Sequence, residues 1–213
     1  MNRLLPGIIA MAIVVVAANI LVQFLVGQWL TWGAFTYPLA FLVTDVMNRV
    51  YGPREARNVI FAGFAVGILC SLIGSQIMLQ GDGYEFAAVA FRVAIASGIA
   101  FLSAQLLDVA VFERLRGGTW WRAPLLSSLV GSALDTALFF TIAFSATFGR
   151  VFSEAANAEV NWAWDAVPFM GVGAAVPLWV SLAFADWMVK LALALVALIP
   201  FRVLVAKLSP NTA

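Results

Sequence analysis

The sequence predicts an all-α integral membrane protein, a bundle of six transmembrane helices. Of its 213 residues, 63% are hydrophobic and 11% are charged, whereas soluble domains are about half apolar and about a quarter charged. A water-soluble globule of this size could not bury so much apolar surface. The apolar runs are continuous and lack the two-residue alternation of a membrane β-barrel. We therefore expect residues 1–213 to form a single helical membrane domain.

Six stretches have the length of a membrane span, which needs about 20 mostly apolar residues to cross about 30 Å of hydrocarbon. They are Leu4–Val26, Trp29–Met47, Val59–Leu79, Ala88–Phe112, Leu125–Phe148 and Gly173–Ile199. The first is too long for a signal peptide and has no clear cleavage site, so we expect it to be retained. Pro38 and Pro177 lie inside two of these spans and are expected to kink them.

Basic residues gather in the connections on one side of the predicted membrane: Arg3, Arg49, Arg54, Arg57, Arg114, Arg116, Arg122, Arg202 and Lys207. Because Lys and Arg resist translocation, this side is predicted to be cytoplasmic, together with both termini. Arg49, Arg54 and Arg57 are expected to fix this topology and to contact anionic headgroups. On the other side, residues 149–170 form a longer segment, for which a lid, a short interfacial helix and a plain loop all stay open.

The composition excludes several classes of protein. A formal net charge of +1 disfavours direct nucleic-acid binding by bulk electrostatics. The absence of histidine and the single cysteine exclude histidine-based catalysis, a disulfide framework and a cysteine metal cluster. The sequence has no P-loop pattern and no aspartyl-protease context around its acids. We therefore expect no enzyme activity, no catalytic residue, no metal and no cofactor.

Six ionisable residues fall inside the predicted spans: Asp45, Arg92, Asp108, Asp135, Asp186 and Lys190. A charge at the bilayer centre costs about 2.5–3.5 kcal/mol, so such residues usually face the bundle interior and have partners. Asp186 and Lys190 are four residues apart and can neutralise each other, which a simple helix–helix clamp would also explain. Three further acids with only Arg92 as a basic partner are harder to explain as clamps.

Polar residues accompany these charges at helical spacing. The stripes are Asn19 with Gln23, Asp45 with Asn48, Gln105 with Asp108, and Ser128 with Ser132 and Asp135. Amides and hydroxyls alone would be interhelical contacts worth about 0.6 kcal/mol each. Polar stripes on several helices are better explained by a shared polar cavity, which is typical of a transporter or channel.

Several blocks of the sequence resemble the vitamin uptake transporter family, and within it the bacterial queuosine precursor transporter group. The most extensive are TWGAFTYPLAFLVTDVMNRVYGP at Thr31–Pro53, QLLDVAVFERLR at Gln105–Arg116, LDTALFFTIAF at Leu134–Phe144 and DWMVK at Asp186–Lys190. Shorter blocks are NILVQ at Asn19–Gln23, RVAIAS at Arg92–Ser97 and WWRAP at Trp120–Pro124. Together they cover nearly all of the chain except the segment after Gly149.

The resemblance implies a multi-pass protein of the bacterial inner membrane that imports 7-deazaguanine bases, such as 7-cyano-7-deazaguanine, for queuosine salvage into tRNA. The expected partners are this purine-like substrate and the lipid bilayer. An alternative is a substrate-capture subunit of an energy-coupling factor transporter, so an ATPase partner stays open, as does a homo-oligomer. Proton-coupled import is a further hypothesis, because an acid inside the membrane is a suitable proton carrier.

A deazaguanine edge carries two neighbouring donors and a carbonyl acceptor, so a carboxylate can accept both donors while aromatic rings stack on the face. We expect Asp135 or Asp186 to accept from the amine edge, and Lys190 to hold Asp186 or to donate to the carbonyl. Tyr37, Phe35 or Trp179 would stack. The full expected substrate-binding set is Asn19, Gln23, Tyr37, Asp45, Arg92, Gln105, Asp108, Asp135, Trp179, Asp186 and Lys190.

Overall fold

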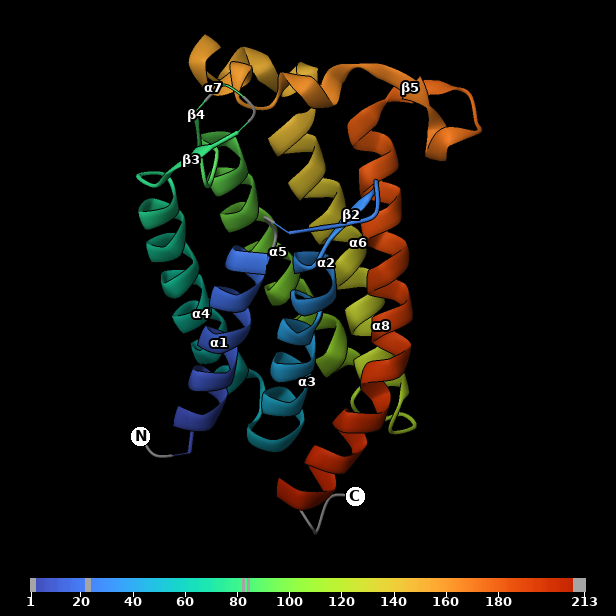
Figure 1. Cartoon of the computed structure of the whole chain (residues 1–213). Coiled ribbons are helices and arrows are strands. Elements are labelled where there is room, and N and C mark those ends of the chain that lie inside the picture. The colour runs from blue at the N-terminus through green and yellow to red at the C-terminus, as the bar shows by residue number, and fades with distance from the viewer. Residues whose placement is uncertain (1–2, 22–23, 82, 84, 209–213) are drawn as a thin grey trace.

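The computed structural model describes residues 3–21, 24–81, 83 and 85–208, and its long helices stand side by side as a bundle (Figure 1). Within these ranges, four helices are long and apolar enough to cross a membrane: α4 (Pro53–Gly74), α5 (Phe91–Leu115), α6 (Arg122–Phe144) and α8 (Leu178–Leu208). A shorter apolar helix, α1 (Leu5–Leu21), precedes them. The chain is therefore a multi-pass helical membrane protein.

The second predicted span is interrupted. Strand β1 (Leu25–Val26) pairs with β2 (Leu30–Thr31), and helix begins only at α2 (Gly33–Thr36), which continues through Tyr37 and Pro38 into α3 (Leu39–Tyr51). The prediction of one continuous helix over Trp29–Met47 is therefore wrong. Proline has no N–H to donate within a helix, and the backbone tightens after it, with the Ala40 N–H donating to the Tyr37 carbonyl at 2.9 Å. The break expected at Pro38 is confirmed.

The last predicted span begins and ends later than expected. Helix α8 starts at Leu178 and ends at Leu208, whereas the prediction was Gly173–Ile199. Pro177 ends strand β6 (Ala175–Pro177) immediately before α8, so the expectation that it kinks a span is wrong. Proline is tolerated at a strand end or a helix start, where no internal hydrogen bond is lost. The proline inside this helix is Pro200.

The segment after α6 is a series of short elements that lies across one end of the bundle (Figure 1). It contains η1 (Ala146–Val151), α7 (Glu154–Ala158), η2 (Asn161–Trp164), β5 (Ala166–Pro168), η3 (Phe169–Gly171) and β6, which pairs with β5. The hairpin of β3 (Met78–Gln80) and β4 (Glu85–Ala87) lies at the same end. We call this the outer end. The start of α1 and the end of α8 lie at the opposite, inner end.

Three helices approach one another closely at Gly131 of α6. A Cβ atom there would lie 2.7 Å from the Phe41 ring, 3.3 Å from the Ala104 carbonyl oxygen and 3.3 Å from the Asp108 Cβ. Glycine therefore lets α3 and α5 pack directly against α6. This contact places the acids of α3 and α5 against the polar stripe of α6.

Candidate functional site

The centre of the bundle holds a buried charged cluster around Lys190, which we call the central cluster: Tyr37, Asp135, Thr136, Asp186 and Lys190. The Lys190 ammonium lies 2.7 Å from Asp135 Oδ2 and 2.5 Å from Asp186 Oδ2, and it donates to Thr136 Oγ1 at 3.0 Å. Lys190 is 4% exposed and Asp135 is 3% exposed. The intrahelical pair expected from the spacing of Asp186 and Lys190 is confirmed, and Asp135 joins it from α6.

Tyr37 brings the kink between α2 and α3 into the central cluster. Its hydroxyl donates to Asp135 Oδ1 at 3.1 Å, and the Lys190 ammonium lies 5.5 Å from its ring centroid. Phe101 packs edge-on against the same ring. Tyr37 is thus engaged through its hydroxyl and its ring in this closed arrangement, where we had expected a free stacking platform.

Asp186 keeps acceptor capacity for a ligand. Its Oδ2 receives Lys190 and a 2.9 Å hydrogen bond from Thr136 Oγ1. Among the described residues, no hydrogen bond is made to its Oδ1, and the residue is only partly buried. The central cluster carries two carboxylates and one ammonium, so it has one negative charge in excess and an oxygen that can accept from a ligand.

A second acidic site lies nearer the inner end, which we call the inner pair: Asp45 of α3 and Asp108 of α5. The two carboxyl groups are neighbours where α3 packs against α5, since Thr44 next to Asp45 donates to Gln105, and Asn48 donates to the carbonyl of Val109 next to Asp108. Asp45 is 3% exposed and Asp108 is fully buried. Ser127 and Ser128 of α6 donate to the two Asp45 oxygens at 3.1 Å each. Within the described residues, neither Asp108 oxygen has a hydrogen-bond partner.

Gln105 lies one turn from Asp108 on α5 and connects the inner pair to the rest of α3. Its Oε1 accepts from Thr44 Oγ1 at 2.5 Å, and Gln105 and Thr44 are both fully buried. In the part of the chain that the structure describes, its Nε2 has no acceptor. Burying an amide N–H without an acceptor costs free energy, so the surrounding contacts must offset the desolvation of Gln105.

A small cavity connects the two acidic sites. It has a volume of about 20 Å³ between α3, α6 and α8, and its walls include Asp45, Ser128, Ser132 and Lys190. One water molecule needs at least about 10–15 Å³, so this space suits a single water. A more open hollow of about 230 Å³ lies between α6 and α8, with Thr136, Trp179 and Trp187 in its walls.

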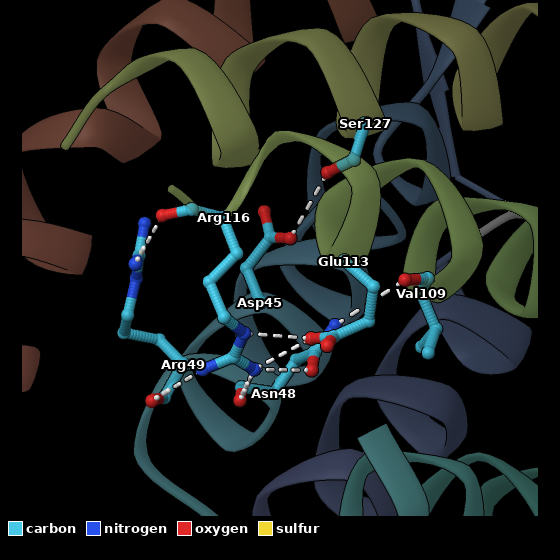
Figure 2. A network of polar contacts seen from close by, with 7 residues as sticks. All are labelled: Asp45, Asn48, Arg49, Val109, Glu113, Arg116 and Ser127. Atoms are coloured by element: carbon cyan, nitrogen blue, oxygen red, sulfur yellow. Dashed lines mark hydrogen bonds and ion pairs between the residues drawn. The ribbon is translucent and has the colours of Figure 1, made fainter. Parts of the chain in front are cut away.

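The inner ends of α3 and α5 are joined by a network of Asn48, Arg49, Val109, Glu113 and Arg116 (Figure 2). Arg116 donates to the Asn48 carbonyl, to Asn48 Oδ1 at 2.9 Å and to the Arg49 carbonyl at 3.3 Å, while Arg49 donates to the Arg116 carbonyl at 3.1 Å. Glu113 lies 2.6 Å from Arg116. Arg49 therefore serves the contact between α3 and α5, and its contact with lipid headgroups stays a prediction.

Arg92 lies apart from both acidic sites, at the outer end. It is fully buried and donates to the carbonyls of Ile142 and Ser145 and, at 2.8 Å, to Asn157 Oδ1. The last carbonyls of a helix have no intrahelical donor and attract cations, so Arg92 caps α6 and holds the outer segment to it. The expectation that Arg92 is a basic partner for the membrane acids is wrong.

The structure thus brings seven of the expected substrate-binding residues into the two acidic sites and their surroundings: Tyr37, Asp45, Gln105, Asp108, Asp135, Asp186 and Lys190. Trp179 lines the hollow next to Thr136. Asn19 donates to the Val15 carbonyl of its own helix at 2.9 Å, and Gln23 lies outside the described residues. Thr44, Ser127 and Thr136 were not among the predicted residues, although each is adjacent in sequence to a polar residue of the predicted stripes.

Comparison with known proteins identifies the family. Residues 31–205, which contain both acidic sites, match the family described as "Putative vitamin uptake transporter". The chain belongs to the vitamin uptake transporter family. No solved structure matches it.

Three curated relatives of this transporter chain carry related names. The "Queuosine precursor transporter" of Escherichia coli (strain K12) is 41% identical over 142 residues, which are 62% of this chain and 64% of the relative. A "Probable queuosine precursor transporter" of Haemophilus influenzae is 36% identical over 177 residues, 80% of this chain and 66% of the relative. Another protein with this name, from Bacillus subtilis, is 27% identical over 196 residues, which are 88% of this chain and 76% of the relative. The chain spans slightly less than two thirds of the first two relatives.

Proposed function

We propose that this chain imports queuosine precursors, 7-deazaguanine bases such as the 7-cyano and 7-aminomethyl compounds, across the bacterial inner membrane. The observation that carries the proposal is the buried central cluster, in a family whose curated relatives are named for these substrates. In this proposal, six spans cross the membrane and both termini face the cytoplasm, with the basic inner end at that side.

Recognition of the base rests on the carboxylates of Asp186, whose Oδ1 receives no hydrogen bond from the described residues, and of Asp135, whose Oδ1 becomes available when Tyr37 moves away. The ring N–H and the exocyclic amine of the base donate to one carboxylate, a contact worth about 1–3 kcal/mol of discrimination. Lys190, held between both acids, then donates to the base carbonyl. Trp179, in the hollow that Thr136 also lines, supplies an aromatic surface for the ring face.

Substrate entry requires the helices to separate. The cavity of about 20 Å³ is far below the roughly 300–1,000 Å³ of small-molecule pockets. The described arrangement is therefore a closed form, and binding must widen the space between α3, α6 and α8. The break at Pro38 provides a point at which α2 can move relative to α3, carrying Tyr37 away from Asp135.

The test is a binding titration followed by uptake, both with the purified chain. Calorimetry in detergent compares the 7-cyano and 7-aminomethyl bases with guanine and with an unrelated vitamin, and we expect only the deazaguanines to bind tightly. Uptake of a radiolabelled base into liposomes that contain this chain alone should follow. If no purine-like base binds, the substrate class is wrong. Binding without uptake would instead favour a capture subunit that needs a separate energy-coupling module.

A further inference from the structure

The inner pair differs from the central cluster because no basic side chain among the described residues forms an ion pair with it. Asp45 receives two serine hydroxyls, and Asp108 receives no hydrogen bond from the described residues. Nothing in the proposed recognition of the base uses these two buried carboxyl groups. They therefore require a separate explanation.

Two neighbouring carboxylates in a low-dielectric interior repel strongly, so such a pair usually retains one proton between its members. Here the desolvation is complete for Asp108 and nearly complete for Asp45. A proton on the pair removes the repulsion and gives the Asp108 carboxyl a bonding partner. The Gln105 amide, fully buried one turn away with no acceptor for its Nε2, adds a polar group on the same face of α5.

The charged groups around the pair also indicate that it carries one proton. On the inner side, Arg49 of α3 and Glu113 with Arg116 of α5 form the network of Figure 2, and no described guanidinium makes an ion pair with Asp45 or Asp108. Across the cavity, Lys190 of α8 is already paired with Asp135 and Asp186. Helix α6 faces the pair with hydroxyls alone. The carboxylates of Asp45, Asp108 and Glu113 and the guanidinium groups of Arg49 and Arg116 together leave one negative charge. One proton neutralises it.

The inner pair is separated from the central cluster but can communicate with it. Ser128, which holds Asp45, and Asp135 are seven residues apart on α6, about 10 Å at 1.5 Å per residue. The cavity between them touches Asp45 at one end and Lys190 at the other, with Ser132 in its wall and space for one water. A change of charge at Asp45 therefore alters the electrostatic potential at the Lys190 ammonium across this small cavity.

We propose that Asp45 and Asp108 form a proton-binding site, distinct from the central cluster, and that the proton carried there drives substrate import. One proton from the outer side binds to the ionised pair, and the base binds at the central cluster. The pair then releases this proton to the inner side. The coupling of this proton to substrate import rests on the proposed function, whereas the presence of a proton on Asp45 and Asp108 does not.

The first experiment needs no substrate. Infrared spectra of the purified wild-type protein at neutral pH should contain the C=O stretching band of a buried carboxylic acid. The double variant Asp45→Asn/Asp108→Asn, which has no carboxyl group at the pair, should lose this band, whereas Asp165→Asn, the same change at an exposed residue, should keep it. A wild-type spectrum without the band, or an unchanged band in the double variant, would overturn the proton site.

The second experiment tests coupling in liposomes that contain a pH-sensitive dye. With wild type and Asp165→Asn, adding a deazaguanine base outside should acidify the lumen, and an inward proton gradient should accelerate uptake. With Asp108→Asn, the ratio of uptake rates with and without the gradient should fall to about one. An unchanged ratio, or acceleration by a sodium gradient in place of a proton gradient, would refute coupling at this pair. A wild type that binds no base fails the proposed function, while the infrared result still decides the proton site.

Discussion

Replacing Asp135 by asparagine tests the role of its carboxylate in binding the base without a large loss of protein stability. The substitution removes the negative charge 2.7 Å from Lys190, but the asparagine oxygen can still accept from the Tyr37 hydroxyl. Lys190 remains paired with Asp186 at 2.5 Å and hydrogen-bonded to Thr136 at 3.0 Å. No charge is left buried without a partner, so the variant should insert and fold.

The magnitudes follow from these contacts. The stability cost is that of one hydrogen bond to a charged group, about 1.5–3 kcal/mol. Loss of a two-pronged contact to the base costs about 1–3 kcal/mol. Since about 1.4 kcal/mol corresponds to tenfold in affinity, the Kd for the base should rise by about 5- to 140-fold.

The assay is calorimetric titration with 7-cyano-7-deazaguanine, together with thermal unfolding in the same detergent. Asp165→Asn is the matched control, since it makes the same chemical change at an exposed position. It should leave both the Kd and the unfolding temperature at the wild-type values. A Kd for Asp135→Asn that equals that of Asp165→Asn would refute a role of Asp135 in binding the base.

Three further perturbations test the architecture. Lys190→Met leaves Asp135 and Asp186 buried without their cation and should lower the free energy of unfolding by about 3–5 kcal/mol. Thermal unfolding in detergent should show a larger loss than for Asp135→Asn, and equal losses would contradict a cation shared by both acids. Arg92→Met should speed hydrogen exchange over residues 149–157, because Asn157 loses its donor, whereas the exposed Arg150→Met should not. Gly131→Ala should cost about 1–3 kcal/mol through overpacking, because a Cβ atom there meets Phe41 and the Ala104 carbonyl. Gly117→Ala, with open space around it, is the control for the unfolding measurement.

What could be predicted from the sequence was the local part of the site. The four-residue spacing of Asp186 and Lys190 fixes their shared helix face, and Pro38 has no N–H, so the ion pair and the helix break both follow from short stretches of chain. The partner of Asp135 depends on how α6 is rotated against α8, which is set by packing between distant parts of the chain and not by a short stretch of sequence. The contacts of Arg92 could not be predicted because most of its acceptors are backbone carbonyls, which no residue type in the sequence marks.

The reciprocal arginine contacts between α3 and α5 have a mechanical consequence. Each guanidinium holds the main chain of the other residue, so the two helix ends separate only if several bonds break together. Helix α8 reaches the same region through the ring contact of Phe201 with Phe112, at 6.3 Å between centroids, which a sliding motion can preserve. Several hydrogen bonds therefore hold α3 to α5 at this end, whereas α8, which carries the lysine that both acids share, meets the same region through a ring contact.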